Sequence, residues 1–229
     1  MDLTFGQFEQ IVKTCDKFVE GAQNWRDRRA ALLLQHAGLI LASLTAYDYQ
    51  CRITYEPLLS DDFVNWSEDQ RAKVLAQMKT FVRVHEIYPV LDHHLTALEN
   101  YVAGFAAGGM AWYRRLITPR NQRAAATKLV RAGRDYHELM ITVRRFKGRW
   151  QPTAQPDIVL PRRRDQAHKH AEDILGPIKT QGWELLDEAR SAYGTIEDEI
   201  LKRHTKLISW KQLQVDLSAL TPSLAGSAS

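Results

Sequence analysis

Apolar residues recur every three or four positions along most of this 229-residue chain, whereas strict alternation of apolar and polar residues is nearly absent. The first spacing is typical of amphipathic helices and the second of strands, so the pattern predicts an all-α protein. In the N-terminal quarter one apolar stripe extends from Phe5 to Cys51, and a break in it is most expected at Gly21 or Asn24. One long helix over residues 1–53 or two shorter helices both fit this stripe.

Signals for helix ends divide the rest of the chain. Ser67 to Gln70 match a capping box, which predicts a helix start at Ser67. Pro89 predicts a kink or break in that helix, and Pro119 predicts the first turn of the next one, which ends at Gly148. We therefore expect an elongated antiparallel bundle of long, kinked helices. Its expected parts are a bundle of two or three long helices over 1–148, a proline-rich linker over 149–161, C-terminal helices packed on the bundle over 162–218, and a flexible tail over 219–229.

Composition adds that the chain folds as a soluble protein, because 45% of its residues are hydrophobic and 25% are charged. The longest apolar runs are interrupted by polar residues or shorter than the roughly 20 residues that a membrane-spanning helix needs. The first residues lack the basic-then-apolar layout of a signal peptide, so a cytoplasmic location is expected. Cys15 and Cys51 form no C-x-x-C pair, and their apolar phase predicts buried, reduced thiols.

The net charge of +4 hides an uneven layout along the chain. Residues 114–169, named here the basic block, carry 15 basic and 4 acidic residues, a net charge of +11. The segments before and after the basic block carry net charges of −4 and −3. A basic segment of this size predicts contact with an anionic partner, which is nucleic acid, an acidic protein surface or, less favoured, a membrane surface.

The residue types of the basic block favour nucleic acid. Arginine outnumbers lysine 12 to 3, and the planar guanidinium binds phosphate through two hydrogen bonds. Phe146 and Trp150 are interleaved with the cations, as in grooves that stack single-stranded bases. We therefore predict a non-enzymatic binding or assembly protein that can form a homo-oligomer. The predicted nucleic-acid-binding residues are Arg114, Arg115, Arg120, Arg123, Arg131, Arg134, Arg144, Arg145, Lys147, Arg149, Trp150, Arg162, Arg163 and Arg164. The alternative is that both aromatic side chains are buried and the arginines pair with the acidic flanks, within one chain or between subunits.

The stretch LPRRRDQAHKH, residues 160–170, supports an enzymatic alternative. Its arginines and histidines satisfy the spacing R-x4–6-H, from Arg163 to His168 and from Arg164 to His170. This spacing resembles the signature of the metal-independent ribonucleases of the HEPN superfamily, which are all-α. The resemblance implies that an arginine and a histidine at a helix start act on the scissile phosphate and the 2′-hydroxyl. The other interpretation is that the stretch forms the charged first turn of a helix, with both histidines on its surface.

Metal, cofactor and membrane sites are less favoured. His168 and His170 lie about 200° apart on a helix, and adjacent His93 and His94 diverge by about 100°, so neither pair is predicted to bind one metal ion. No metal and no cofactor are expected, since the motifs for phosphate-binding loops, dinucleotides and zinc proteases do not occur. A third alternative is a membrane-surface or membrane-active helical protein, because an apolar stretch over 101–115 ends with two aromatic residues and two arginines.

Overall fold

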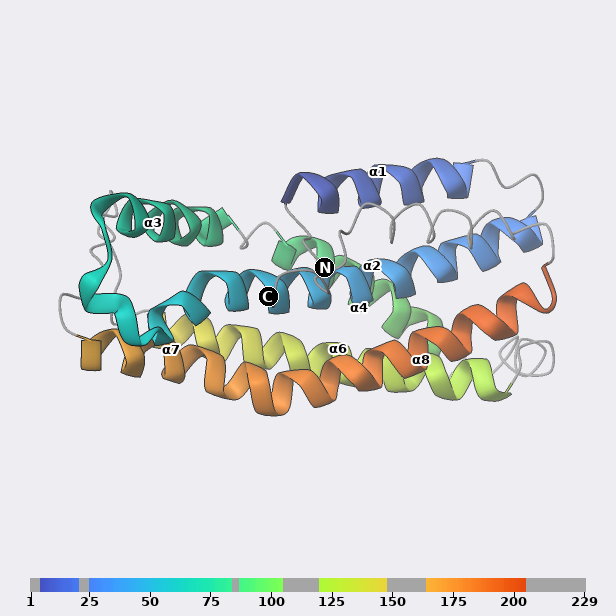
Figure 1. Ribbon diagram of the computed structural model, residues 1–229. Helices are drawn as coiled ribbons and strands as arrows, with labels where there is room; N and C mark the ends of the chain where they lie inside the picture. Colours follow the sequence, from blue (N-terminus) through green and yellow to red (C-terminus); the bar gives the residue numbers. More distant parts are fainter. Residues whose placement is uncertain (1–4, 21–24, 84–86, 105–119, 148–163, 205–229) are drawn as a thin grey trace.

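The computed structural model describes residues 5–20, 25–83, 87–104, 120–147 and 164–204, and these are almost entirely helical with no strand among them. The prediction of an all-α protein is therefore confirmed. In chain order the elements are α1 (Phe5–Glu20), α2 (Trp25–Tyr55), the 3-10 turns η1 (Glu56–Leu59) and η2 (Asp61–Asn65), α3 (Glu68–Arg83), α4 (Ile87–Ala103), α6 (Arg120–Lys147), α7 (Arg164–Pro177), the π-helical turn η5 (Ile178–Gly182) and α8 (Trp183–Leu201) (Figure 1).

The N-terminal stripe forms two helices. The chain leaves helix α1 at Glu20 and starts α2 at Trp25, and α1 packs back along α2 (Figure 1). The break falls where Gly21 and Asn24 predicted it. Because α1 folds back on α2, the apolar stripes of the two helices face each other. Cys15 of α1 is buried, as are the matching apolar positions of α2.

Helix α2 lies at the centre of the fold and packs against every other α-helix among the described residues. Its burial therefore extends well beyond one stripe: Ala31, Leu34, Leu39 and Ala46 are all inaccessible or nearly so. The stripe positions predicted for this segment are buried, and burial extends beyond them because neighbours cover α2 on several sides. A helix that is apolar around most of its circumference is typical of such a position.

The segment Asp27–Leu59, which covers α2 and η1, is long and apolar enough to cross a membrane by length and composition. The expectation that no segment reaches this length was therefore wrong. Its most apolar window is 67% buried inside the protein, however, which fits the core helix of a helical protein equally well.

The predicted start of α3 is confirmed by its hydrogen bonds. The backbone N–H of Gln70 donates to Ser67 Oγ at 3.3 Å, and the Ser67 N–H donates to Gln70 Oε1 at 2.8 Å. These reciprocal bonds form a complete capping box. Pro89 lies in the first turn of α4, where a missing N–H removes no helical hydrogen bond. The break predicted near Pro89 is therefore the boundary between α3 and α4.

The C-terminal helices α7 and α8 pack on α2 and α6, and α6 and α8 lie side by side over much of their length (Figure 1). Between α7 and α8 the path stays helical but widens into the π-helical turn directly after Pro177. A proline within a helix removes one donor and clashes with the preceding turn, which accounts for a local change of winding at this position. The predicted linker and tail lie outside the described residues.

Candidate functional site

The basic block is described in part. Arg120, Arg123, Lys128, Arg131 and Arg134 lie on α6, and Arg164 and Lys169 lie on α7. Arg144, Arg145 and Lys147 belong to the last turn of α6. The remaining predicted residues, which are Arg114, Arg115, Arg149, Trp150, Arg162 and Arg163, lie outside the described residues.

Arg134 is directed at α4. Its Nε and Nη2 donate to the two carboxylate oxygens of Glu99 at 2.5 and 2.9 Å. Its Nη1 donates to Asp92 Oδ1 at 2.6 Å, and Nη2 also reaches Thr96 Oγ1 at 3.1 Å. The hydrogen bond from Arg134 lowers the pKa of Glu99. With its donors directed at two carboxylates, Arg134 joins α6 to α4, and we leave it out of the proposed binding surface.

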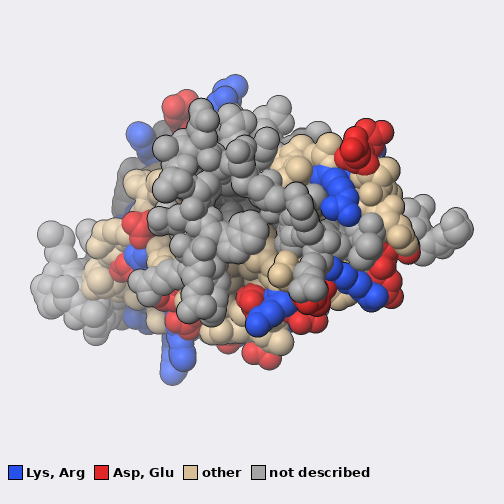
Figure 2. All heavy atoms as spheres, turned by 90° about the vertical axis from the view of Figure 1, so that its left-hand side faces the viewer, with Lys and Arg blue, Asp and Glu red and all other residues tan. Residues whose placement is uncertain are grey.

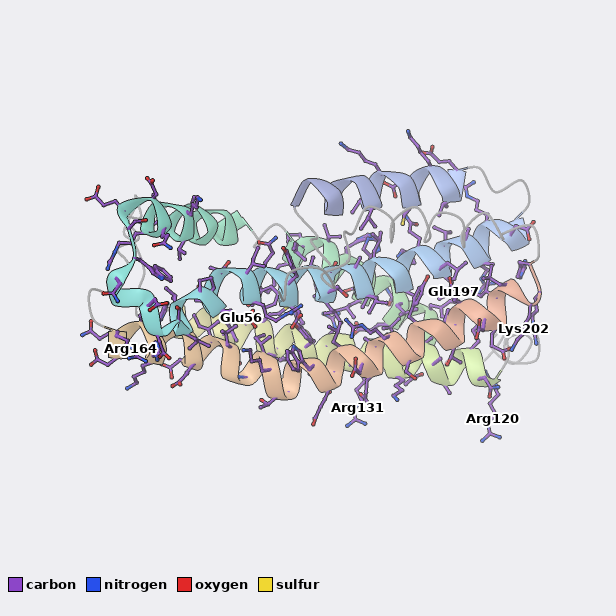
Figure 3. The ribbon with its side chains drawn as sticks, in the orientation of Figure 1. Glu56, Arg120, Arg131, Arg164, Glu197 and Lys202 are labelled. Carbon is purple, nitrogen blue, oxygen red and sulfur yellow. The ribbon has the colours of Figure 1, made fainter. Side chains whose placement is uncertain are left out.

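The outward face of α6 carries the cations that are least engaged. Arg120 is exposed, and Arg131 is 83% exposed with only a 3.8 Å contact to Asp135 one turn along the same helix. Figure 3 shows both side chains projecting from α6 away from the other helices. They are separated by three helical turns, so they point in nearly the same direction about 16 Å apart along the axis. Arg120 and Arg131 are named here the outward arginine pair.

Lys128 lies to one side of the outward arginine pair and reaches towards α8. Its Nζ is 3.6 Å from Glu188 Oε1, and both side chains are about half exposed. Helix α8 carries six acidic residues and one arginine, Arg190. Lys128 therefore contacts one carboxylate of the acidic helix α8.

The start of α7 forms contacts with the two 3-10 turns. Arg164 donates from Nη2 to Asp61 Oδ1, and His168 Nε2 lies 3.4 Å from the carbonyl oxygen of Ser60. The His170 ring meets Tyr55 edge-on, with 5.6 Å between ring centroids. Arg164 and His168 thus face adjacent residues of one turn, whereas His170 faces the end of α2.

These contacts bear on the predicted ribonuclease site. The alternative needs an arginine and a histidine free to meet a phosphate. The guanidinium of Arg164 is already paired with a carboxylate, and His170 is directed at Tyr55 and away from the Ser60 turn. Figure 2 shows acidic and basic residues interspersed on the end of the molecule that carries this turn. These contacts indicate that the described part of the stretch holds the start of α7 against the two 3-10 turns.

Sequence reasoning missed a cluster of three histidines, His36 of α2 with His93 and His94 of α4. The Nδ1 atoms of His36 and His94 are 2.8 Å apart, and the three ring centroids lie 5.0 to 6.4 Å from one another. The only signal in the sequence was that His36 and His94 fall on apolar phases of their helices. Among the residues that the structure describes, no group of three or more His, Cys, Asp or Glu is arranged to hold a metal ion.

Asp48 is a second feature that the sequence did not predict. This buried carboxylate of α2 accepts hydrogen bonds from Arg52 Nε at 3.0 Å and from Trp183 Nε1 at 3.0 Å. Trp183 is 44% exposed, yet its Nε1 atom is held by the buried Asp48. Cys15, by contrast, is a buried free thiol as predicted, and burial raises its pKa to about 12.

Comparisons with protein-family models, with curated proteins and with solved structures found no match to this chain.

Proposed function

We propose that this chain is a non-enzymatic, all-helical binding or assembly protein that engages an anionic partner, with nucleic acid favoured, through the outward face of α6. The observation that carries the proposal is the outward arginine pair. Arg120 lies in the first turn of α6, where the helix dipole disfavours cations, whereas Arg131 lies three turns further along, beyond the reach of that effect. They contribute nothing evident to the packing of α6, and a bound anion would offset the unfavourable charge.

Phosphate suits this arrangement better than a single carboxylate does. Two exposed guanidinium groups about 16 Å apart on one line can contact separate phosphates of the same strand. An arginine side chain can contact each phosphate through two donors.

The proposed surface also requires that neighbouring helices keep α6 straight. We propose that the helices form an elongated antiparallel bundle in which α6 presents one long side. The support for this arrangement is the length of α6, 28 residues, together with its contact along α8 (Figure 1).

The test is fluorescence anisotropy with a labelled single-stranded RNA and a labelled duplex DNA, at several salt concentrations. We expect the double variant Arg120→Ala with Arg131→Ala to weaken binding. If each arginine neutralises one phosphate, the slope of log affinity against log salt falls by about 1.4 for the single strand and 1.8 for the duplex. Arg190→Ala is the matched control, because Arg190 is an exposed arginine on the acidic helix α8.

Two results would contradict the proposal. The first is an absence of binding to either nucleic acid at low salt, which would favour an acidic protein surface or lipid as the partner. The second is an equal loss of affinity in the double variant and in Arg190→Ala. Running the same samples on a denaturing gel tests the ribonuclease alternative, since cleavage that His168→Ala or His170→Ala abolishes would establish an enzyme.

A further inference from the structure

The contact between His36 and His94 lies inside the interface between α2 and α4. His94 is only 8% exposed and His36 is half-buried. Their Nδ1 atoms are 2.8 Å apart, which is hydrogen-bonding distance. A hydrogen bond between two nitrogen atoms needs one donor and one acceptor, so one ring carries a proton on Nδ1 and the other does not.

This arrangement is incompatible with two charged rings. An imidazolium carries a proton on both nitrogens, so two imidazolium rings would place two N–H groups against each other. The neutral state is favoured by the surroundings: burial first, and then the neighbouring rings of His36 and His93, together lower the pKa of His94 to about 4. Burial, and then His93, lowers the pKa of His36 as well.

The charged groups on the packed helices are engaged elsewhere. On α4, Asp92 and Glu99 are held by Arg134 of α6. On α1, Asp16 accepts a hydrogen bond from Gln35 at 2.6 Å. On α6, the ring of His137 meets the Tyr88 ring of α4 edge-on, with 5.6 Å between centroids. Burial lowers the pKa of His137 too. None of these described groups forms an ion pair with His36, His93 or His94, so no described carboxylate compensates a second positive charge in the cluster.

We propose that the His36–His94 contact is a pH-sensitive joint between α2 and α4, which holds the two helices together while at least one ring is neutral and separates them when both rings are protonated. Separation uncovers the apolar residues that α4 and α2 bury, including Leu91, Leu95 and Ile40. The device lies on α2 and α4 and does not depend on the anion-binding surface of α6.

The direction of the pH effect follows from proton binding. Histidines in the unfolded or opened chain take up protons near pH 6.5, whereas His94 in the closed protein does so only near pH 4. The closed state is therefore fully stable above pH 6.5 and loses stability as the pH falls below that value. Between pH 7.5 and pH 5, His94 alone raises the equilibrium constant for opening about 30-fold. His36 acts in the same direction.

The first experiment compares urea unfolding and binding of an apolar dye at pH 7.5 and pH 5 in the wild type and in the double variant His36→Asn with His94→Asn. Asparagine places an amide near the Nδ1 position and does not titrate. From pH 7.5 to pH 5, we expect the unfolding constant of the wild type to rise by a factor at least 30 times larger than that of the double variant. His168→Asn is the control, because His168 lies on α7 outside the cluster, and it should behave as the wild type does. Equal pH dependence of the wild type and the double variant would overturn the proposal.

A second measurement needs no variant. Nitrogen NMR of the eight histidine side chains distinguishes the two neutral tautomers and the charged form. We expect one ring protonated on Nδ1 at pH 7.5, and the ring of His94 still neutral at pH 5.5. If all eight rings carry their neutral proton on Nε2, or all titrate near pH 6.5, the joint does not exist.

Discussion

Gly133 offers the sharpest test of the packing at the centre of the fold. It is buried in α6, and a Cβ atom at this position would lie 2.6 Å from Leu95 Cδ2 on α4 and 3.4 Å from Ile40 Cγ2 on α2. Both neighbours are fully buried, so neither has solvent to move into. Forcing an extra methyl group into a well-packed core costs about 1–3 kcal/mol. Alanine regains about 1 kcal/mol through its higher helix propensity. We therefore expect Gly133→Ala to destabilise the protein by about 1 kcal/mol, the midpoint of the difference.

The matched control is Gly194→Ala. Gly194 lies within α8, and a Cβ atom there would meet nothing within 4 Å. The propensity gain is then unopposed, so this variant should stabilise the protein by up to about 1 kcal/mol. Urea unfolding followed by circular dichroism measures both, read as opposite shifts of the midpoint at unchanged slope. If both variants shift the midpoint in the same direction and by similar amounts, α6 does not approach α4 as closely as described.

Two further predictions concern polar contacts. Replacing Arg134 by Met keeps the aliphatic stem but breaks the link to Asp92 and Glu99, and we expect a loss of about 1 kcal/mol in urea unfolding at low salt. The lowered pKa of Glu99 means that this contribution is present at neutral pH and is lost in acid as Glu99 protonates, so the two proteins should converge there; a constant difference at all pH values would argue against the pair. Replacing Ser67 by Ala removes the capping bond to Gln70 and should cost about 1 kcal/mol. Hydrogen exchange should show faster exchange of the Gln70 amide, while Ser67→Asp keeps it slow; equal exchange in both variants would contradict the cap.

The helices could be predicted from local signals because those signals act within one turn of chain. The capping box at Ser67 and the proline in the first turn of α4 each act through neighbouring backbone groups, and both are confirmed. The burial of α2 could not be predicted in the same way. How many sides of α2 are covered depends on which helices surround it, and that is set by long-range packing.

The charge of the candidate site could be predicted from the sequence, but the directions of its side chains could not. Helical spacing placed Arg120, Arg131 and Arg134 off the apolar stripe, and all three are at least partly exposed. It could not show that Arg134 meets two carboxylates of α4, because Asp92 and Glu99 lie 42 and 35 residues away in the sequence. The contact of His36 with His94 was hidden for the same reason, at a separation of 58 residues.

The contacts of these side chains limit how many cations of the basic block can bind a partner. Arg134, Arg164 and Lys128 each contact a carboxylate of another element. Among the α6 side chains that the structure describes, Arg120 and Arg131 are the exposed arginines. If these two alone bind phosphate, the salt dependence of binding to a single strand has a slope of about −1.4. A measured slope several times steeper would require cations beyond this pair. The basic residues between the last turn of α6 and the start of α7 would then be the first to exchange for alanine, because they supply the greatest remaining concentration of arginine in the chain. A slope near −1.4 would instead assign the described face of α6 as the whole of the electrostatic contact.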